Sequence, residues 1–236
     1  MKNELQEYAT SLGVHFKDFD LLQQVFVHRS YLNEHRSFRL SHNERLEFLG
    51  DAVLELVVTE HLYKNYKNPE GELTNWRSAL VRGEMLARIA NEISMNPHLL
   101  LSKGEQKSQG KARQLILANT FEAFVGALYL DQGYEVVQEF IGKYLLVYLE
   151  EVFEKRLHVD TKSDFQEKSQ EAFGLTPSYR VITTSGPDHD KKFEVAAFLG
   201  ETQAGIGAGR SKQKAEQAAA SAALEHWEEL IKKLRA

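Results

Sequence analysis

The 236-residue sequence contains no cysteine, which excludes a disulfide framework and any metal site built on thiolates. A chain without cysteine suits a reducing compartment, so we expect a cytoplasmic protein. The sequence also lacks an apolar run approaching the ~18 residues that a membrane span needs. Its start, MKNELQEYATSLGVHF, is polar and amphipathic, unlike the apolar core of a signal peptide. We therefore expect no association with a membrane.

An excess of positive charge is missing as well. The net charge is −5, from 29 Lys and Arg against 34 Asp and Glu. Residues 1–159 carry 18 basic and 22 acidic side chains, and residues 160–236 carry 11 and 12. Proteins that coat nucleic acid through bulk charge usually show a basic excess. Any contact with nucleic acid must therefore come from local basic clusters.

Most of the chain shows the apolar spacing i, i+3, i+4 that is typical of helices. Short turn sequences such as NPEGEL and DQGYE separate the helical segments, and no alternating strand pattern occurs between them. The segments are residues 20–32, 44–63, 74–93, 115–133 and 134–157. We therefore predict an all-α domain over residues 1–157.

The pattern changes after the polar stretch LHVDTKS, and we predict a linker at residues 158–161. Residues 162–234 then favour a compact α-β-β-β-α module of about 70 residues, which is enough for an independent unit. Its predicted elements are a helix at 164–174, strands at 178–185, 192–199 and 202–209, and a helix at 211–234. The predicted fold is an all-α domain followed by a small α+β domain.

Four carboxylates interrupt the otherwise apolar segment NERLEFLGDAVLELV, residues 43–57. At about 100° per residue, Glu44, Glu47, Asp51 and Glu55 lie within about 80° of arc. Apolar residues occupy most of the remaining circumference, so we expect a buried helix. A stripe of acids repels itself unless water or a cation compensates it. A solvated face is the ordinary explanation, but few lysines intervene here.

A second helix supplies further oxygen atoms. Residues 115–130, LILANTFEAFVGALYL, are apolar almost all round, which predicts burial, yet they include Asn119 and Glu122 at i, i+3. Oxygen ligands from two converging helices suit a hard cation such as Mg²⁺, which serves phosphoryl-transfer chemistry. A di-iron carboxylate bundle also buries acids, but it needs Glu-x-x-His pairs. None of the nine histidines follows a glutamate at that spacing, which argues against this rival.

The stretch HNERLEFLGD, residues 42–51, resembles the signature of the ribonuclease III family. HRS precedes it at residues 28–30, and EGELTNWRSALVRGEMLARIA and LANTFEAFVGALYLDQG follow it. The second module resembles a double-stranded RNA-binding domain. Together the two resemblances cover nearly the whole chain, in the order of a bacterial-type enzyme.

The resemblance implies an active site. Glu44, Glu47 and Asp51 match the three acids of the family's signature helix, and Glu122 matches its essential metal-binding glutamate. Glu70, in PEGEL, matches an acid near the same valley. The implied catalytic residues are Glu44, Asp51 and Glu122. The implied cofactor is Mg²⁺, with Mn²⁺ as a substitute, and no small-molecule cofactor is implied. The implied metal ligands are Glu47, Asp51, Asn119 and Glu122.

The implied enzyme is a homodimer in which two signature helices pack together and each subunit cuts one strand of double-stranded RNA. Its products would carry 5′-phosphate and 3′-hydroxyl ends with a short 3′ overhang, in the processing of ribosomal and messenger RNA. Gly50 could let the two helices approach closely, or it could pack within its own subunit. Glu55 matches no role and is interpreted as structural or as part of the valley rim. Residues 33–41 are interpreted as a surface loop.

Asn119 departs from the family pattern, which usually has Asp in LAD-xx-EA. An asparagine oxygen can still ligate Mg²⁺ or hold a metal-bound water, but it adds no negative charge, so we expect weaker metal affinity. An active natural variant, a natural loss of activity and a deliberate substitution all stay open. The alternative function is a double-stranded RNA-binding protein with a weakened or silent nuclease centre.

The run GIGAGRSKQKAEQAAASAAL, residues 205–224, carries the clearest nucleic-acid pattern. Its glycines would allow close backbone approach, and Ser211 is placed as an N-cap with Lys212 and Lys214 in the following turn. Free N–H groups, the positive end of the helix dipole and lysines suit phosphates. Gln213 stands where the family often has Lys or Arg, so we expect somewhat weaker binding.

The other expected RNA contacts come from the resembled domain. Its first helix, with Gln166 and Glu167 here, and its first strand-to-strand turn, with His189 here, enter successive minor grooves and touch 2′-hydroxyls. An exposed turn residue without contact is an equally good interpretation of His189. This mode reads the shape of the duplex, not its sequence.

Overall fold

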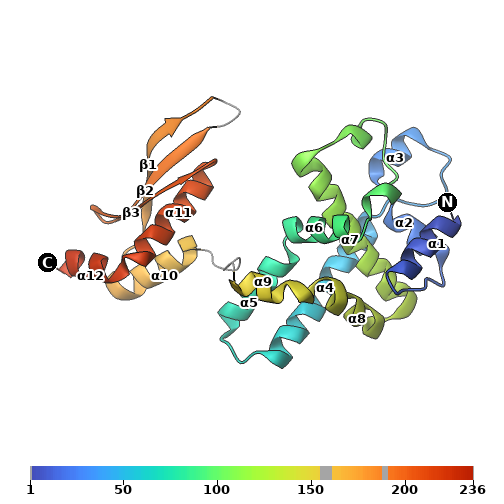
Figure 1. The fold of residues 1–236 in the computed structure, drawn as a ribbon, viewed down its shortest axis with the longest axis horizontal. Coiled ribbons are helices and arrows are strands. Elements are labelled where there is room, and N and C mark those ends of the chain that lie inside the picture. The colour runs from blue at the N-terminus through green and yellow to red at the C-terminus, as the bar shows by residue number, and fades with distance from the viewer. Residues whose placement is uncertain (1, 155–160, 188–190, 236) are drawn as a thin grey trace. The chain divides into compact units, whose positions relative to one another are not determined.

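The computed structural model describes residues 2–154, 161–187 and 191–235. The chain divides into two compact units, residues 1–158 and 159–236, and each is described by itself (Figure 1). Positions 158–160 of the predicted linker lie outside the described residues, whereas Thr161 begins the first helix of the second unit. Within the described part of the chain, no helix is long and apolar enough to cross a membrane.

The first unit is helical, as predicted (Figure 1). Its β-type pairing is limited, among the described residues, to one parallel bridge between Val27 and Leu100. The α-helices are α1 (Lys2–Ser11), α2 (Phe19–Val25), α3 (Arg29–Glu34), α4 (Glu44–Asn65), α5 (Glu70–Val81), α6 (Gly83–Glu92), α7 (Gly110–Gln132), α8 (Tyr134–Tyr144) and α9 (Leu149–Glu154). Short 3-10 turns lie at η1 (Asn96–His98), η2 (Glu105–Lys107) and η3 (Leu146–Tyr148).

Three of the predicted helical segments are interrupted, and this corrects the sequence prediction. Segment 20–32 breaks between α2 and α3, where the His28 amide donates to the Leu100 carbonyl at 3.1 Å. Segment 74–93 breaks at Arg82, whose extended backbone (φ −63°, ψ 144°) separates α5 from α6. Segment 134–157 breaks at Leu145. Apolar periodicity runs on across each of these breaks, so it could not reveal them.

Helices α4 and α7 cross in direct backbone contact at two glycines. A β-carbon built on Gly50 would lie 1.7 Å from the carbonyl oxygen of Glu122, and one built on Gly126 would lie 2.2 Å from the carbonyl oxygen of Leu46. Of the two readings of Gly50, packing within its own subunit is therefore the correct one. The crossing sets α4 and α7 side by side near the centre of the unit (Figure 1).

The two crossing helices differ in burial. Helix α7 is buried over most of its length, as predicted, with α2, α4, α6 and α8 around it. Helix α4 was also predicted to be a buried helix, and this prediction is wrong for its outer face. Its inner face is buried, but Phe48 is 82% exposed, Leu56 is 56% exposed and Tyr63 is 76% exposed. The acids of α4 therefore share its outer surface with an exposed apolar stripe.

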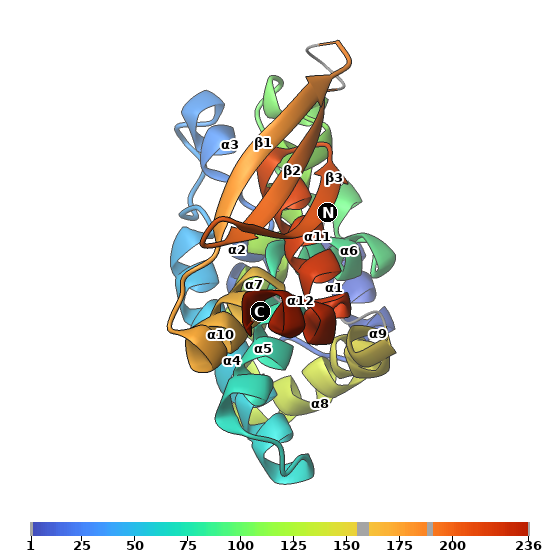
Figure 2. The same ribbon diagram turned by 90° about the vertical axis from the view of Figure 1, so that its left-hand side faces the viewer.

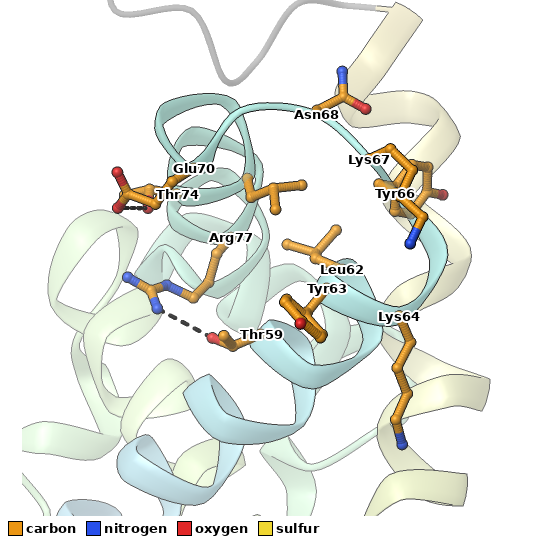
Figure 3. A pocket seen from close by; sticks show the side chains of 11 residues that line it. Thr59, Leu62, Tyr63, Lys64, Tyr66, Lys67, Asn68, Glu70, Thr74 and Arg77 are labelled. Atoms are coloured by element: carbon orange, nitrogen blue, oxygen red, sulfur yellow. Dashed lines mark hydrogen bonds between the residues drawn. The ribbon is translucent and has the colours of Figure 1, made fainter.

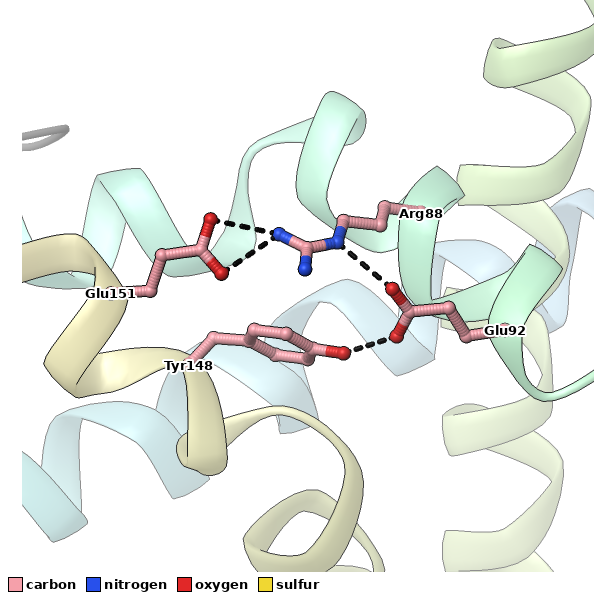
Figure 4. A network of polar contacts seen from close by, with 4 residues as sticks. All are labelled: Arg88, Glu92, Tyr148 and Glu151. Carbon is pink, nitrogen blue, oxygen red and sulfur yellow. Dashed lines mark hydrogen bonds and ion pairs between the residues drawn. The ribbon is translucent and has the colours of Figure 1, made fainter. Parts of the chain in front are cut away.

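A polar network ties α9 to α6 (Figure 4). Arg88 donates to both carboxylate oxygens of Glu151 at 2.9 Å and to Glu92 at 2.9 Å. Its guanidinium lies 4.6 Å from the ring centroid of Tyr148, whose hydroxyl donates to Glu92. The network fixes the last described helix of the first unit.

The second unit has the predicted α-β-β-β-α order (Figure 2). Its three antiparallel strands, in the order β1-β2-β3, have the predicted bounds. The elements are α10 (Thr161–Phe173), β1 (Ser178–Ser185), β2 (Lys192–Leu199), β3 (Thr202–Gly209), α11 (Lys212–Glu225) and α12 (Trp227–Arg235). The single helix predicted for 211–234 is therefore two helices, separated at His226.

The glycines of β3 serve packing within this unit. A β-carbon on Gly205, Gly207 or Gly209 would lie 2.4, 2.1 or 2.6 Å from backbone atoms of α11. The close approach that these glycines allow is thus between β3 and α11. This corrects the prediction that they form part of the nucleic-acid pattern.

Candidate active site and nucleic-acid interface

The α4–α7 crossing brings the predicted acids of the two helices together. The pKa of Glu122 is raised to about 8, first by burial and then by the nearby carboxylates of Asp51 and Glu47. Burial also raises the pKa of Glu47, as do Glu44 and Asp51, while a hydrogen bond with the Asn119 side chain acts in the opposite direction. These coupled shifts show that the side chains share one environment, which we call the acid cluster (Glu47, Asp51, Asn119 and Glu122).

The acid cluster offers only hard oxygen donors from carboxylates, with one side-chain amide. Carboxylates that repel one another favour a cation between them, and binding of the cation would release the proton that Glu122 holds. Among the described residues, however, no three Asp, Glu, His or Cys side chains form a ready-made metal cluster. The residues fit a small hard ion that keeps several water ligands, because such an ion needs only one or two carboxylates directly.

Glu44 lies at the edge of the acid cluster and has partners of its own. Its carboxylate is 3.5 Å from Nη1 of Arg29 and 3.7 Å from Nδ1 of His42. Glu55, two turns beyond Glu47, is exposed and makes no hydrogen bond or ion pair with any residue that the structure describes. Of the four acids aligned on α4, Glu47 and Asp51 are thus the two that act directly on Glu122.

Glu70 lies apart from the acid cluster within one chain. It accepts a hydrogen bond from the Thr74 hydroxyl at 3.2 Å and lines a pocket of about 650 Å³ (Figure 3). The pocket lies where the end of α4 meets the start of α5, and Tyr63 is among its lining residues. At about 1.5 Å per residue, Tyr63 is about 18 Å along α4 from Asp51. Arg77 crosses the pocket edge and donates to the Thr59 hydroxyl at 3.1 Å.

In the second unit, the start of α11 has the predicted geometry. Ser211 is the N-cap, and its hydroxyl accepts from the Lys214 amide at 3.2 Å. Lys212 and Lys214 are both exposed, with their side chains in the first turn. An N-terminal helix end with adjacent lysines is favourable for an anion.

Helix α10 carries the other described contact candidates. Gln166 and Glu167 are exposed, and Gln166 lines a polar pocket of about 260 Å³ together with Gln213 of α11. His189 lies outside the described residues. The periodicity did not identify Lys162, which pairs with Glu216 at 2.7 Å. Its ammonium also lies 4.9 Å from the Tyr179 ring centroid, so the start of α10 is fixed against α11 and β1.

A helical unit with a partly buried acid cluster, followed by an α-β-β-β-α unit with a basic helix end, defines a nuclease-type domain joined to an RNA-binding module. Residues 18–149 match the family described as Ribonuclease-III-like, and residues 161–226 match the double-stranded RNA binding motif. The chain belongs to the ribonuclease III family. The resemblance and the predicted fold class are thereby confirmed.

Relatives and solved structures agree with this membership. Ribonuclease 3 of Oceanobacillus iheyensis is 47% identical over 224 residues, which are 94% of this chain and 97% of the relative. Ribonuclease 3 of Borreliella burgdorferi is 42% identical over 230 residues, which are 97% and 94%. The nuclease domain of ribonuclease III from Campylobacter jejuni has a TM-score of 0.53 and 39% identity, covering 59% of this chain and 94% of that one.

Proposed function

We propose that the protein is an endoribonuclease that cleaves double-stranded RNA. The observation that carries this proposal is the acid cluster, in which Glu122 has its pKa raised to about 8 by burial and by two neighbouring carboxylates. Strongly perturbed carboxyl groups of this kind are characteristic of functional sites. The double-stranded RNA binding motif of the same chain supports the choice of substrate.

The cofactor that suits the acid cluster is Mg²⁺, with Mn²⁺ as a substitute. When bound, such an ion supplies Lewis acidity and lowers the pKa of a water ligand, so that water can attack phosphorus. Glu47, Asp51, Asn119 and Glu122 would hold it, and their charge would keep its outer waters oriented. Asp51 and Glu122 are the proposed catalytic residues, together with Glu44. The products would be 5′-phosphate and 3′-hydroxyl ends.

A homodimer is part of this proposal. The exposed apolar side chains of Phe48, Leu56 and Tyr63 form a stripe beside the acids of α4. Burying this stripe against a second copy would remove it from water and bring two acid clusters to one groove. The Campylobacter jejuni structure was described in terms of a region involved in dimer formation.

The same packing would bring Glu70 near the proposed active site. If two α4 helices pack antiparallel about a two-fold axis, the end of α4 in one subunit lies near the start of α4 in the other. Glu70, which is distant from the acid cluster of its own chain, would then approach the cluster of the partner subunit. Gel filtration with light scattering tests this proposal, and a monomer at working concentration would contradict it.

The second unit would hold the duplex by its shape. Gln166 and Glu167 on α10, and His189, which lies between β1 and β2 in the sequence, would enter minor grooves, where they can reach 2′-hydroxyls. Ser211 with Lys212 and Lys214 would contact the phosphates between the grooves. Precursors of ribosomal and messenger RNA in the cytoplasm are the proposed substrates.

A second candidate function rests on Asn119. Its side chain bonds Glu47 but adds no charge to the cluster, so a silent centre on a double-stranded RNA-binding protein is the alternative. The deciding experiment compares the unchanged chain with Asn119→Asp and Glu122→Gln on a long labelled duplex with Mg²⁺. Cleavage by the unchanged chain and none by Glu122→Gln supports the nuclease. Cleavage by Asn119→Asp alone, with duplex binding in all three, supports the alternative.

A further inference from the structure

Arg29 lies at the first position of α3, and hydrogen bonds fix the backbone on both sides of it. Nδ1 of His28 accepts from the Ser30 amide at 3.3 Å and lies 2.8 Å from the Ser30 hydroxyl. The Ser30 hydroxyl in turn accepts from the Ser102 amide at 3.1 Å, and the His28 amide donates to the Leu100 carbonyl at 3.1 Å. The backbone of Arg29 is therefore fixed on both sides, which limits the positions that its guanidinium can reach.

The guanidinium of Arg29 faces Glu44, the first acid on α4. The distance of 3.5 Å from Nη1 to the carboxylate is that of an ion pair without a close hydrogen bond, and the Arg29 side chain is 70% exposed. Such exposed pairs contribute little to stability and exchange readily for another anion. Glu44 also has His42 at 3.7 Å on its other side, so its carboxylate stands between two nitrogen groups.

Arg29 differs from the arginines whose donors are already used. Arg39 donates twice to the Asp20 carboxylate, and Arg88 donates to two glutamates. Arg29 makes no hydrogen bond with any residue that the structure describes, so its N–H groups are available to a ligand. A planar guanidinium offers two parallel donors to a phosphate, which is the geometry that phosphates favour.

The charges around Arg29 indicate which kind of ligand its guanidinium would bind. Glu44 raises the pKa of Glu47 and is therefore close to the acid cluster, which repels the phosphates of an approaching RNA strand. A cation beside the cluster would offset that repulsion where a phosphate has to enter. We propose that Arg29 binds an RNA phosphate at the edge of the acid cluster, and that Glu44 positions its guanidinium. This inference rests on the proposed function and gives Glu44 a positioning role in place of a catalytic one.

The test compares Arg29→Ala, Arg29→Lys and Glu44→Gln with the unchanged chain. Arg45→Ala is the matched control, because Arg45 is exposed on α4 but lies about 100° around the helix from Glu44, away from the other acids. Steady-state cleavage of a labelled duplex with Mg²⁺ gives KM and kcat. Binding of the same duplex in EDTA over a range of KCl concentrations gives the salt dependence, and circular dichroism gives the melting temperature.

For Arg29→Ala we expect KM to rise about tenfold with kcat nearly unchanged, because a charged contact to substrate is lost. The slope of log binding constant against log salt should fall in magnitude by about one, and Arg29→Lys should restore most of it. The melting temperature and the control should not change. For Glu44→Gln we expect a smaller rise in KM, of about threefold.

An unchanged KM and salt slope in Arg29→Ala would overturn the inference, and so would equal losses in the Arg45→Ala control. A fall in kcat without a rise in KM for Glu44→Gln would return Glu44 to a catalytic role. If the unchanged chain does not cleave, the proposed function fails, but the salt slopes measured in EDTA still decide whether Arg29 contacts a phosphate.

Discussion

The substitution Gly50→Ala should disable the active site through a single methyl group. The new β-carbon would lie 1.7 Å from the Glu122 carbonyl oxygen and 2.9 Å from the Gly126 nitrogen, whereas ordinary contacts begin at 3.4 Å. Both neighbours are backbone atoms of α7, so they cannot turn aside as a side chain would. Helices α4 and α7 must therefore separate by roughly 1.7 Å, a shift that also displaces the carboxyl group of Glu122 from those on α4.

The size of the effect follows from that shift. A misplacement of about 1 Å at a reacting centre can reduce the rate by about 100-fold, so we expect at least that loss in kcat for duplex cleavage with saturating Mg²⁺. Overpacking of this kind also costs about 1–3 kcal/mol or more in the free energy of unfolding. A thermal melt followed by circular dichroism shows whether the variant is still folded at the assay temperature, and so separates an inactive folded protein from an unfolded one.

Gly71→Ala is the matched control, because a β-carbon at Gly71 of α5 meets nothing within 4 Å. There the same methyl group should leave cleavage unchanged and raise stability by less than the ~1 kcal/mol of a helix interior, because Gly71 lies in the first turn of α5. If Gly50→Ala cleaves and melts like the unchanged chain, the α4–α7 contact does not set the geometry of the acid cluster, and the reasoning is wrong.

Three further predictions concern the charges of the two sites. The pKa of Glu122 is raised to about 8 in the folded protein without metal, from an ordinary 4.5. The unfolded chain therefore loses this proton at lower pH than the folded one, so Glu122 lowers stability progressively between pH 4.5 and pH 8. Glu122→Gln should remove this loss, and its gain in melting temperature in EDTA should grow from pH 5 to pH 8 and then level off; a gain that does not depend on pH would contradict this. Asn119→Asp adds a charge to the cluster and should lower the Mg²⁺ concentration for half-maximal cleavage several-fold in a metal titration, whereas no change would show that Asn119 is an equivalent ligand. Replacing Lys212 and Lys214 together by Ala should weaken duplex binding and reduce the salt slope by about two, as measured by filter binding in EDTA; an unchanged slope would remove the start of α11 from the RNA interface.

The elements that the sequence predicted best are those bounded by strong local signals. The turn sequences GPDHDK and GE separate the three strands, and the observed bounds of the strands agree with the prediction. The breaks at Arg82 and His226 were missed because apolar spacing continues on both sides of each. A break of that kind depends on distant backbone contacts, which periodicity does not contain.

Glycine was the residue whose role the sequence could not decide. A glycine shows that some backbone approaches closely, but not which one. Gly50 was compatible with a second subunit and proved to meet α7, and Gly207 was compatible with a phosphate and proved to meet α11. In both cases the sequence showed that space was needed, and only the structure showed what occupies it.

The acids of α4 were predicted as a stripe, and the structure divides that stripe by environment. Glu47 and Asp51 act on Glu122 across the helix crossing, whereas Glu44 faces Arg29. All four acids lie within about 80° of arc on a helical wheel, so the wheel assigned them to one stripe and could not separate their environments. The acids differ because different helices lie beside them: α7 lies beside Glu47 and Asp51, and α3 lies beside Glu44.

The exposed surface of α4 carries both the proposed catalytic acids and the apolar stripe of the proposed dimer contact. The sequence suggested a buried helix whose acids are tolerated because metal ions and RNA phosphates lie on them, whereas in the structure three of the four acids are exposed to solvent. The same outer surface exposes Phe48 and Leu56, which a soluble monomer has little reason to keep in contact with water. Since the apolar stripe adjoins the acids, Phe48→Ala should weaken dimerisation and lower cleavage together, with duplex binding by the second unit retained. Light scattering and the cleavage assay are run at the same protein concentration. A monomeric variant that cleaves at the full rate would contradict the prediction, because each acid cluster would then work without a partner subunit.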